Sequence, residues 1–318
     1  NINSAVSVFS NLKEGIMKIM LTDSGGAELY AEAHDIAIKN AGVNILGFIY
    51  SSCSDLGIFF IFYILAIGGN KWLIRILSIL LIMSLLEPIS RGLRTETIMR
   101  CLLILSSYVI FYRFYSKSLN LKIRKWGIIG VIIIAIPTFF LSLSRFGNSD
   151  GGLLGGTASY IGQANLNFNN YCLEAGGIRE GDRTANLFKQ FLGFENVPEG
   201  VMSTRFKHRN MRIDDEHFYT FVGDFVLDYG PFITVFIFIT FSIIFTRITK
   251  VRNPNTIQFS QLLWIYFLSS ISIQGGFFLF NYSFSANWKI ILFILMYIAL
   301  KIDASKNRSM SCLNANNN

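Results

Sequence analysis

The chain has 318 residues, of which 52% are hydrophobic and only 15% are charged. Average soluble proteins carry roughly 25% charged residues, so this composition excludes an ordinary soluble domain and indicates a membrane protein. The formal net charge is +8, but no basic helix or RNA-binding motif accompanies it, which argues against a nucleic-acid-binding protein. Lysine and arginine residues in cytoplasmic loops of a membrane protein explain much of the excess instead.

Seven apolar stretches are predicted to be membrane-spanning helices. A helix needs about 20 residues to cross roughly 30 Å of hydrocarbon, and these continuous runs lack the alternation of barrel strands. The predicted spans are 44–67, 72–89, 95–115, 126–144, 221–245, 258–274 and 287–300. The predicted fold class is therefore an all-α integral membrane protein, a polytopic helix bundle with one large extracytoplasmic loop.

Loop charge predicts the orientation of the chain. The stretch 113–125 carries five lysine or arginine residues and no acid, and the positive-inside rule places such loops in the cytoplasm. Alternation of the spans then puts the long polar loop 145–220 on the extracytoplasmic side. We expect residues 1–318 to form a single transmembrane domain with this segment folded against it. Because the chain starts at Asn1, we also expect a fragment whose upstream helices are missing.

An arginine-rich turn follows the second predicted span. Arg91 and Arg94 are three residues apart and share a helix face, while Arg100 lies about two turns into the next span, where a charge is costly and usually functional. Guanidinium groups bind phosphate oxygens in a bidentate geometry, which predicts a site for an anionic substrate. The alternative is a set of salt bridges to Glu87 and Glu96, with Arg100 reaching the membrane interface.

The segment 145–220 is the second candidate region. Loops of about 75 residues without structure are uncommon and usually functional or disordered. This one is rich in aromatic residues, which suit either sugar binding or anchoring at a membrane interface. They are Tyr160, Phe168, Tyr171, Phe188, Phe191, Phe194 and Phe206.

The exit of this loop concentrates charge. Four cations in 205–212 precede the acids of 214–216 and His217. Asp224 and Asp228 follow four residues apart, so both point to one face of the next span, where buried acids need cationic partners or raised pKa values. A carboxylate or His217 is a candidate general base. The alternative for 214–216 is a solvated charge run, and a divalent cation there is not favoured. No Cys/His cluster occurs, so we predict no zinc site and no other cofactor.

Together these features resemble the Wzy-type oligosaccharide repeat-unit polymerases, which are related to O-antigen ligases. The motifs that carry the resemblance are Ser90-Arg91-Gly92 with Arg94, Tyr160-Ile-Gly162 with Asn167-Phe168-Asn169, and the loop-to-helix transition from Tyr219 to Gly230. In that transition Tyr229 stands where the family commonly has Phe, and Pro231 follows the glycine. Span number, orientation and loop position also match the family.

The resemblance implies a GT-C-like glycosyltransferase of the bacterial cytoplasmic membrane that uses no nucleotide sugar. The donor would be a growing glycan on undecaprenyl diphosphate, and the acceptor a sugar hydroxyl of another lipid-linked repeat unit. Partners would include membrane lipids and a chain-length regulator. An O-antigen ligase and a lipid-linked oligosaccharide flippase or other transporter remain alternatives, although transporters usually show repeated halves and short loops.

The resemblance also implies residue roles. Arg91 and Arg94 would stabilise the charge of the departing lipid diphosphate, and Asp228 or His217 would accept the hydroxyl proton. Arg145 and Arg212 each precede a glycine by eleven residues, a spacing found in some members of the family. The implied substrate-binding residues are Arg100, Arg145, Tyr160, Arg212, Asp224 and Tyr219.

Overall fold

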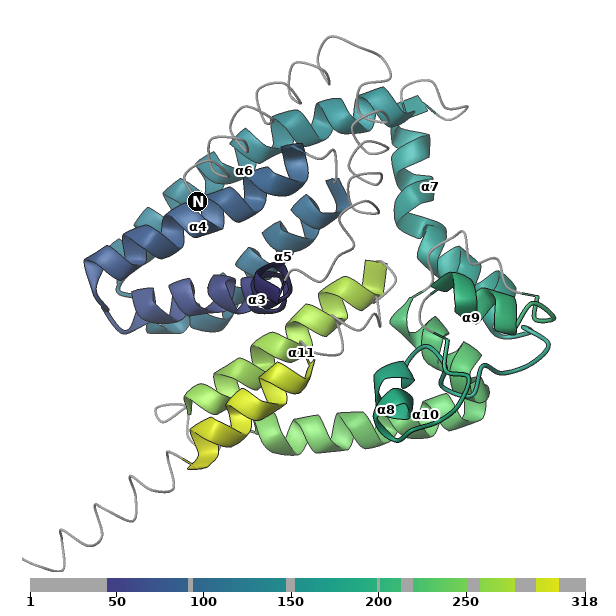
Figure 1. Ribbon diagram of the computed structural model, residues 1–318. Coiled ribbons are helices and arrows are strands. Elements are labelled where there is room, and N and C mark those ends of the chain that lie inside the picture. The colour runs from purple at the N-terminus through teal and green to yellow at the C-terminus, as the bar shows by residue number, and fades with distance from the viewer. Residues whose placement is uncertain are drawn as a thin grey trace, which may run out of the picture. The chain divides into compact units, whose positions relative to one another are not determined.

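The computed structural model describes residues 45–90, 94–146, 152–198, 201–212, 220–250, 258–277 and 290–302. Across these ranges every regular element is a helix and none is a strand, which confirms the all-α prediction. The helices, drawn in Figure 1, form two compact units, divided inside helix α7 after Gly162. The prediction of one transmembrane domain over the whole chain stays a prediction.

Unit 1 is a group of mutually packed apolar helices. It contains α3 (Ile45–Ala66), α4 (Lys71–Ser90), α5 (Arg94–Phe111) with the short turn η1 (Tyr112–Phe114), α6 (Lys117–Phe146) and the start of α7 (Gly152–Asn167). Helices α3, α4 and α5 pack on one another, and α5 also contacts α6. In its core the rings of Phe59 and Phe111 lie 5.1 Å apart. The Tyr115 hydroxyl donates to the carbonyl of Phe62 at 3.1 Å.

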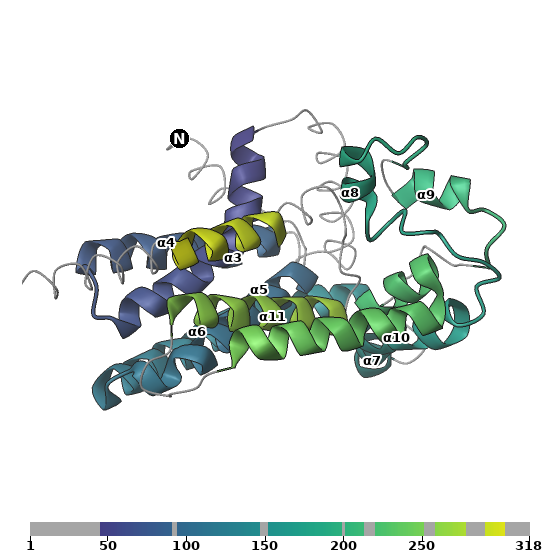
Figure 2. The ribbon, with the colours of Figure 1, turned by 90° about the horizontal axis from the view of Figure 1, so that it is seen from below.

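Unit 2 combines apolar helices with a polar segment. It contains η2 (Phe168–Cys172), α8 (Asn186–Phe191), α9 (Val201–Lys207), α10 (Phe221–Thr249), α11 (Phe259–Phe277) and a final helix, Ile290–Ile302. Helix α10 packs on α11. The rings of Trp264 and Tyr297 lie 5.3 Å apart and those of Phe267 and Phe293 4.7 Å apart, which joins α11 to the final helix. Figure 2 gives a second view of these elements.

Three helices are long and apolar enough to cross a membrane. They cover Glu96–Phe114, Lys117–Phe140 and Phe221–Thr249. Many of their exposed side chains are large and apolar, as with Phe232, which is 83% exposed; such surfaces are stable in hydrocarbon rather than in water. The chain is therefore a membrane protein. Helices are present at all seven predicted positions, but the number of spans and the side occupied by the polar loop remain predictions.

Helix α10 starts with a capped turn and breaks at Gly230. The Thr220 side chain accepts a hydrogen bond from the backbone N–H of Gly223, which satisfies one of the free donors at the helix start. Gly230 has φ 79° and ψ 163°, a conformation that only glycine adopts easily, and Pro231 follows it. The bend is visible in Figure 1. At about 1.5 Å per residue, the part from Pro231 to Thr249 alone nearly covers a hydrocarbon core of about 30 Å.

The polar segment, meaning the described residues between 163 and 212, packs on the first part of α10. A small apolar cluster makes this contact; its buried members are Cys172, Ala175, Val226 and Leu227, with Phe168, Tyr171, Met211 and Val222 around them. Phe168 and Tyr171, two of the loop's aromatic residues, therefore pack against protein. The cluster brings the polar segment against the face of α10 that carries Asp224 and Asp228.

Candidate functional site

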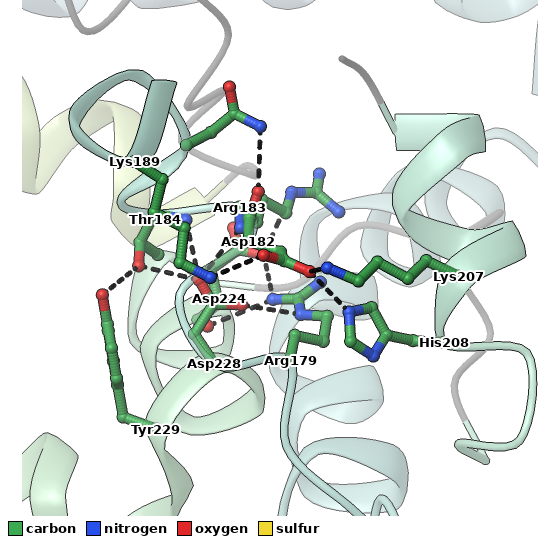
Figure 3. A network of polar contacts seen from close by, with 11 residues as sticks. Arg179, Asp182, Arg183, Thr184, Lys189, Lys207, His208, Asp224, Asp228 and Tyr229 are labelled. Carbon is green, nitrogen blue, oxygen red and sulfur yellow. Dashed lines mark hydrogen bonds and ion pairs between the residues drawn. The ribbon is translucent and has the colours of Figure 1, made fainter. Parts of the chain in front are cut away.

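A buried cluster of four charges joins the polar segment to α10 (Figure 3). Arg179 Nε donates to Asp228 Oδ1 at 2.8 Å, and Arg179 Nη2 to Asp224 Oδ1 at 3.2 Å. Arg183 Nε lies 3.3 Å from the same Asp224 oxygen. The side chains of Arg179 and both aspartates are at most 1% exposed. Two cations thus balance two carboxylates in a site that water does not reach.

The break in α10 explains how the chain forms this cluster. In a regular helix the carbonyl of Leu227 would accept a hydrogen bond from residue 231, but Pro231 has no N–H. The backbone N–H of Arg179 donates to that carbonyl instead, at 2.8 Å. This bond fixes the backbone of Arg179 against the helix, and its side chain then reaches both carboxylates.

Asp228 is surrounded by donors. Its Oδ2 accepts hydrogen bonds from the backbone N–H groups of Arg183 and Thr184, at 3.2 and 2.7 Å, and from Thr184 Oγ1 at 2.7 Å. With Arg179 on the other oxygen, the carboxylate is held by both a charge and a turn of backbone. The Tyr229 hydroxyl lies 3.2 Å from Thr184 Oγ1 and extends this network.

The turn that donates to Asp228 depends on Gly181. This residue has φ 82°, and a Cβ added to it would lie 2.7 Å from the Tyr229 hydroxyl. The glycine therefore permits both the turn and the close approach of the aromatic ring.

A second charged group surrounds Asp182, next to the first. Lys189 from α8 lies 2.6 Å from Asp182 Oδ1, while Lys207 from α9 and His208 lie 2.7 and 2.8 Å from Oδ2. Burial raises the pKa of Asp182, but the hydrogen bonds from the two lysines and from His208 outweigh it and lower that pKa to about 2. This carboxylate connects α8 with α9.

The two groups differ in what they offer to a ligand. Both oxygens of Asp228 already accept hydrogen bonds, so this geometry favours a role in holding the polar segment over a role as general base. Asp224 Oδ2 is buried and has no hydrogen-bond partner within the described part of the chain. Lys207 is 41% exposed and is the accessible cation at the edge of the site. Its ammonium group is paired with Asp182 and donates to the carbonyl of Asn196 at 3.1 Å.

Six predicted site residues cannot be placed by their side chains. Arg91, His217 and Tyr219 lie outside the described residues. The backbones of the other three are helical, in α5, α6 and α7 in turn, but their side chains lie outside the description; they are Arg94, Arg145 and Tyr160.

The structure describes the side chains of the other four predicted residues, which are Asp224, Asp228, Arg212 and Arg100. Asp224 and Asp228 share one helix face and have cationic partners, which confirms that part of the sequence analysis. Arg212 is exposed, and its backbone N–H donates to Ala175 at 2.9 Å. Its assignment to substrate binding stays a prediction.

Arg100 has intramolecular partners in unit 1. Its Nη1 donates to the carbonyl of Ser84 in α4, and its Nη2 lies 3.9 Å from Glu96. The salt bridge to Glu96 is the structural alternative considered from the sequence. Substrate binding by Arg100 stays a prediction, and its contacts with Ser84 and Glu96 are the structural alternative.

Sequence reasoning did not identify the basic members of the cluster. The run Arg179-Glu-Gly-Asp-Arg-Thr184 places two arginines four residues apart around a glycine, and that density of charge was the available signal. The cations of 205–212 are closer in sequence to Asp224 and Asp228 and were therefore the more obvious basic partners.

In the part of the chain that the structure describes, no three His, Cys, Asp or Glu side chains are grouped so as to hold a metal ion. The acidic run 214–216 with His217, where a divalent cation was considered, lies outside that part. No protein family, curated protein or solved structure matches the chain.

Proposed function

We propose that the chain is a glycosyltransferase of the bacterial cytoplasmic membrane that polymerises lipid-linked oligosaccharide repeat units. In this proposal seven helices cross the membrane, and the polar segment lies on the extracytoplasmic side. The proposal rests on the resemblance of three short motifs to repeat-unit polymerases, together with the apolar helices. The product would be a surface polysaccharide such as O-antigen, capsule or exopolysaccharide.

The observation that best supports a functional site is the buried charge cluster of Arg179, Arg183, Asp224 and Asp228. Charges without water are costly to keep, and strongly interacting titratable groups concentrate at functional sites. The position of the cluster in the motif from Tyr219 to Gly230 links it to the resemblance.

The reaction would be a substitution at the anomeric carbon of the donor glycan. An acceptor hydroxyl oxygen attacks this carbon, the bond between the carbon and the diphosphate oxygen breaks, and lipid diphosphate leaves with the electron pair. Arg91 and Arg94 would stabilise the negative charge that develops on the leaving group. His217 or a carboxylate would take the hydroxyl proton.

The cluster would act as a positioning element in this reaction. Arg179 and Thr184 occupy the oxygens of Asp228, so proton acceptance falls more naturally to His217. By fixing the polar segment on α10, the cluster would place Lys207 and its neighbours beside the membrane surface where a lipid diphosphate lies. Asp228 would then affect catalysis through the position of the segment.

Deletion of the gene in its host tests the proposal. If the chain is the polymerase, the ladder of surface glycans on a gel collapses to a single repeat unit on its carrier, because export and ligation still operate. Loss of every repeat unit, including the first, would point to the ligase or the flippase instead. A ladder of unchanged length would reject all three assignments in a host with no second polymerase.

Complementation with charge variants tests the residues. We expect Arg91→Gln to abolish the polymer while the protein remains in the membrane, since one leaving-group contact is typically worth about 10²–10³ in rate. Arg113→Gln, in the predicted cytoplasmic loop, is the matched control and should restore the ladder. Wild-type polymer from Arg91→Gln would remove this residue from the mechanism.

A further inference from the structure

The outer surface of α8 and α9 is unusually apolar for a polar segment. Large side chains that are between 51% and 76% exposed occur in α8, just after it, and in α9; they are Phe188, Phe191, Leu192, Phe194 and Phe206. We call these five residues the aromatic face. In α8 the core contact is made by Leu187, which is 1% exposed, so the fold does not use the aromatic face as its own core.

Cations accompany the aromatic face. Lys189 and Lys207 lie in the same two helices, and Asp182 draws both toward the junction of α8 and α9. The guanidinium of Arg209 lies 5.9 Å from the centre of the Phe206 ring. Aromatic rings with lysine and arginine beside them are the composition of surfaces that lie at the boundary between lipid headgroups and acyl chains.

The buried cluster holds this face close to the hydrophobic part of α10. Thr184, which precedes α8 by two residues, donates two hydrogen bonds to Asp228. Asp228 is itself just before the break at Gly230, where the apolar part of α10 begins. If the membrane encloses Pro231–Thr249, its surface lies near Gly230. Because Thr184 contacts Asp228 beside this break, α8 then lies close to that surface.

From these observations we infer that the aromatic face docks on the lipid bilayer beside α10. Phe191, Leu192 and Phe206 enter the boundary between headgroups and acyl chains, and Arg209, beside the Phe206 ring, faces the lipid phosphates. The occupant is the phospholipid surface itself. This inference needs only a membrane around α10 and is independent of glycan transfer.

Site-directed spin labelling of the full chain in liposomes tests the docking. The native cysteines are replaced, and a nitroxide is placed at Leu192→Cys or Phe206→Cys in vesicles of phosphatidylcholine and phosphatidylglycerol. Gln190→Cys is the matched control, because residue 190 is polar, exposed and on a different side of α8 from Phe188 and Phe191. The readout is the accessibility of each nitroxide to oxygen relative to a water-soluble nickel chelate.

We expect this ratio to be severalfold higher at residues 192 and 206 than at residue 190. Equal and water-like ratios at all three positions would overturn the inference. Protection of 192 and 206 from both reagents, with spectra that sharpen when labelled protein is diluted with unlabelled protein, would also overturn it and identify a second copy of the chain as the occupant.

Discussion

Two helices of this protein, α4 and α10, carry the same backbone interruption and resolve it differently. Pro88 in α4 and Pro231 in α10 both lack the N–H that a helix needs, which frees the carbonyls of Ser84 and Leu227. In unit 1 the side chain of Arg100 donates to the free carbonyl. In unit 2 the backbone N–H of Arg179 does so.

The difference determines what each arginine can still do. The guanidinium of Arg100 contacts the carbonyl of Ser84 and lies near Glu96, which is 54% exposed, so it links α5 to the neighbouring α4. Arg179 fills the carbonyl with its backbone and keeps its guanidinium for Asp224 and Asp228. The same defect therefore gives a local contact in one unit and holds an entire polar segment in the other.

Removal of the buried arginine should have the largest effect. Arg179→Met leaves two carboxylates buried without their main partner, which should cost about 3–5 kcal/mol. Amide hydrogen exchange at residues 183 and 184 measures the opening of the segment and should accelerate by about 10²–10⁴, since 1.4 kcal/mol is a factor of ten. Arg209→Met, an exposed arginine of the same segment, is the control. Unchanged exchange in Arg179→Met would mean that the cluster does not hold the segment.

A substitution at Gly181, in the turn packed against Tyr229, should have the next-largest effect on stability. Gly181→Ala and Gly193→Ala both place alanine at positive φ, but only residue 181 would also meet the Tyr229 ring, whereas residue 193 is in open space. Overpacking costs about 1–3 kcal/mol, so Gly181→Ala should be less stable by that difference. Thermal unfolding of both variants in detergent measures it. Equal losses would show that Tyr229 moves aside without cost.

Acid should weaken the junction of α8 and α9. The pKa of Asp182 is about 2 in the folded protein against an ordinary value of 3.8, so its contribution is complete above about pH 4 and is lost as the pH falls toward 2. A shift of this size corresponds to about 2 kcal/mol. Hydrogen exchange in α9, corrected for its intrinsic pH dependence, should therefore accelerate as the pH falls from 5 to 2.5. In the Asp182→Asn variant, α9 should exchange faster than in the wild type at pH 5, and its exchange should not show this part of the pH dependence.

The smallest effect is expected in unit 1. Arg100→Met removes a hydrogen bond to one carbonyl and a long ion pair with an exposed partner, so it should cost about 1–2 kcal/mol. Arg113→Met is its exposed control, and thermal unfolding of both compares them. A stable Arg100→Met variant that makes no polymer would break the comparison, because Arg100 would then act on substrate as the sequence suggests.

The sequence predicts the helices well because apolar runs are local signals. It also predicts that Asp224 and Asp228 share a face, since four residues make about one helical turn. It does not identify Arg179 as their partner, because that pairing closes a loop of more than forty residues and leaves no periodic trace. The clue lies in Pro231, whose missing N–H requires a donor from elsewhere in the chain.

The order of these residues in the chain also matters for biogenesis. Arg179 and Arg183 leave the ribosome before Asp224 and Asp228, so the two arginines are made before the carboxylates that neutralise them. If α10 were inserted with the opposite orientation, its aspartates would be on the wrong side and the arginines would stay unneutralised. Formation of the cluster thus requires the polar segment and the start of α10 to lie on the same side of the membrane.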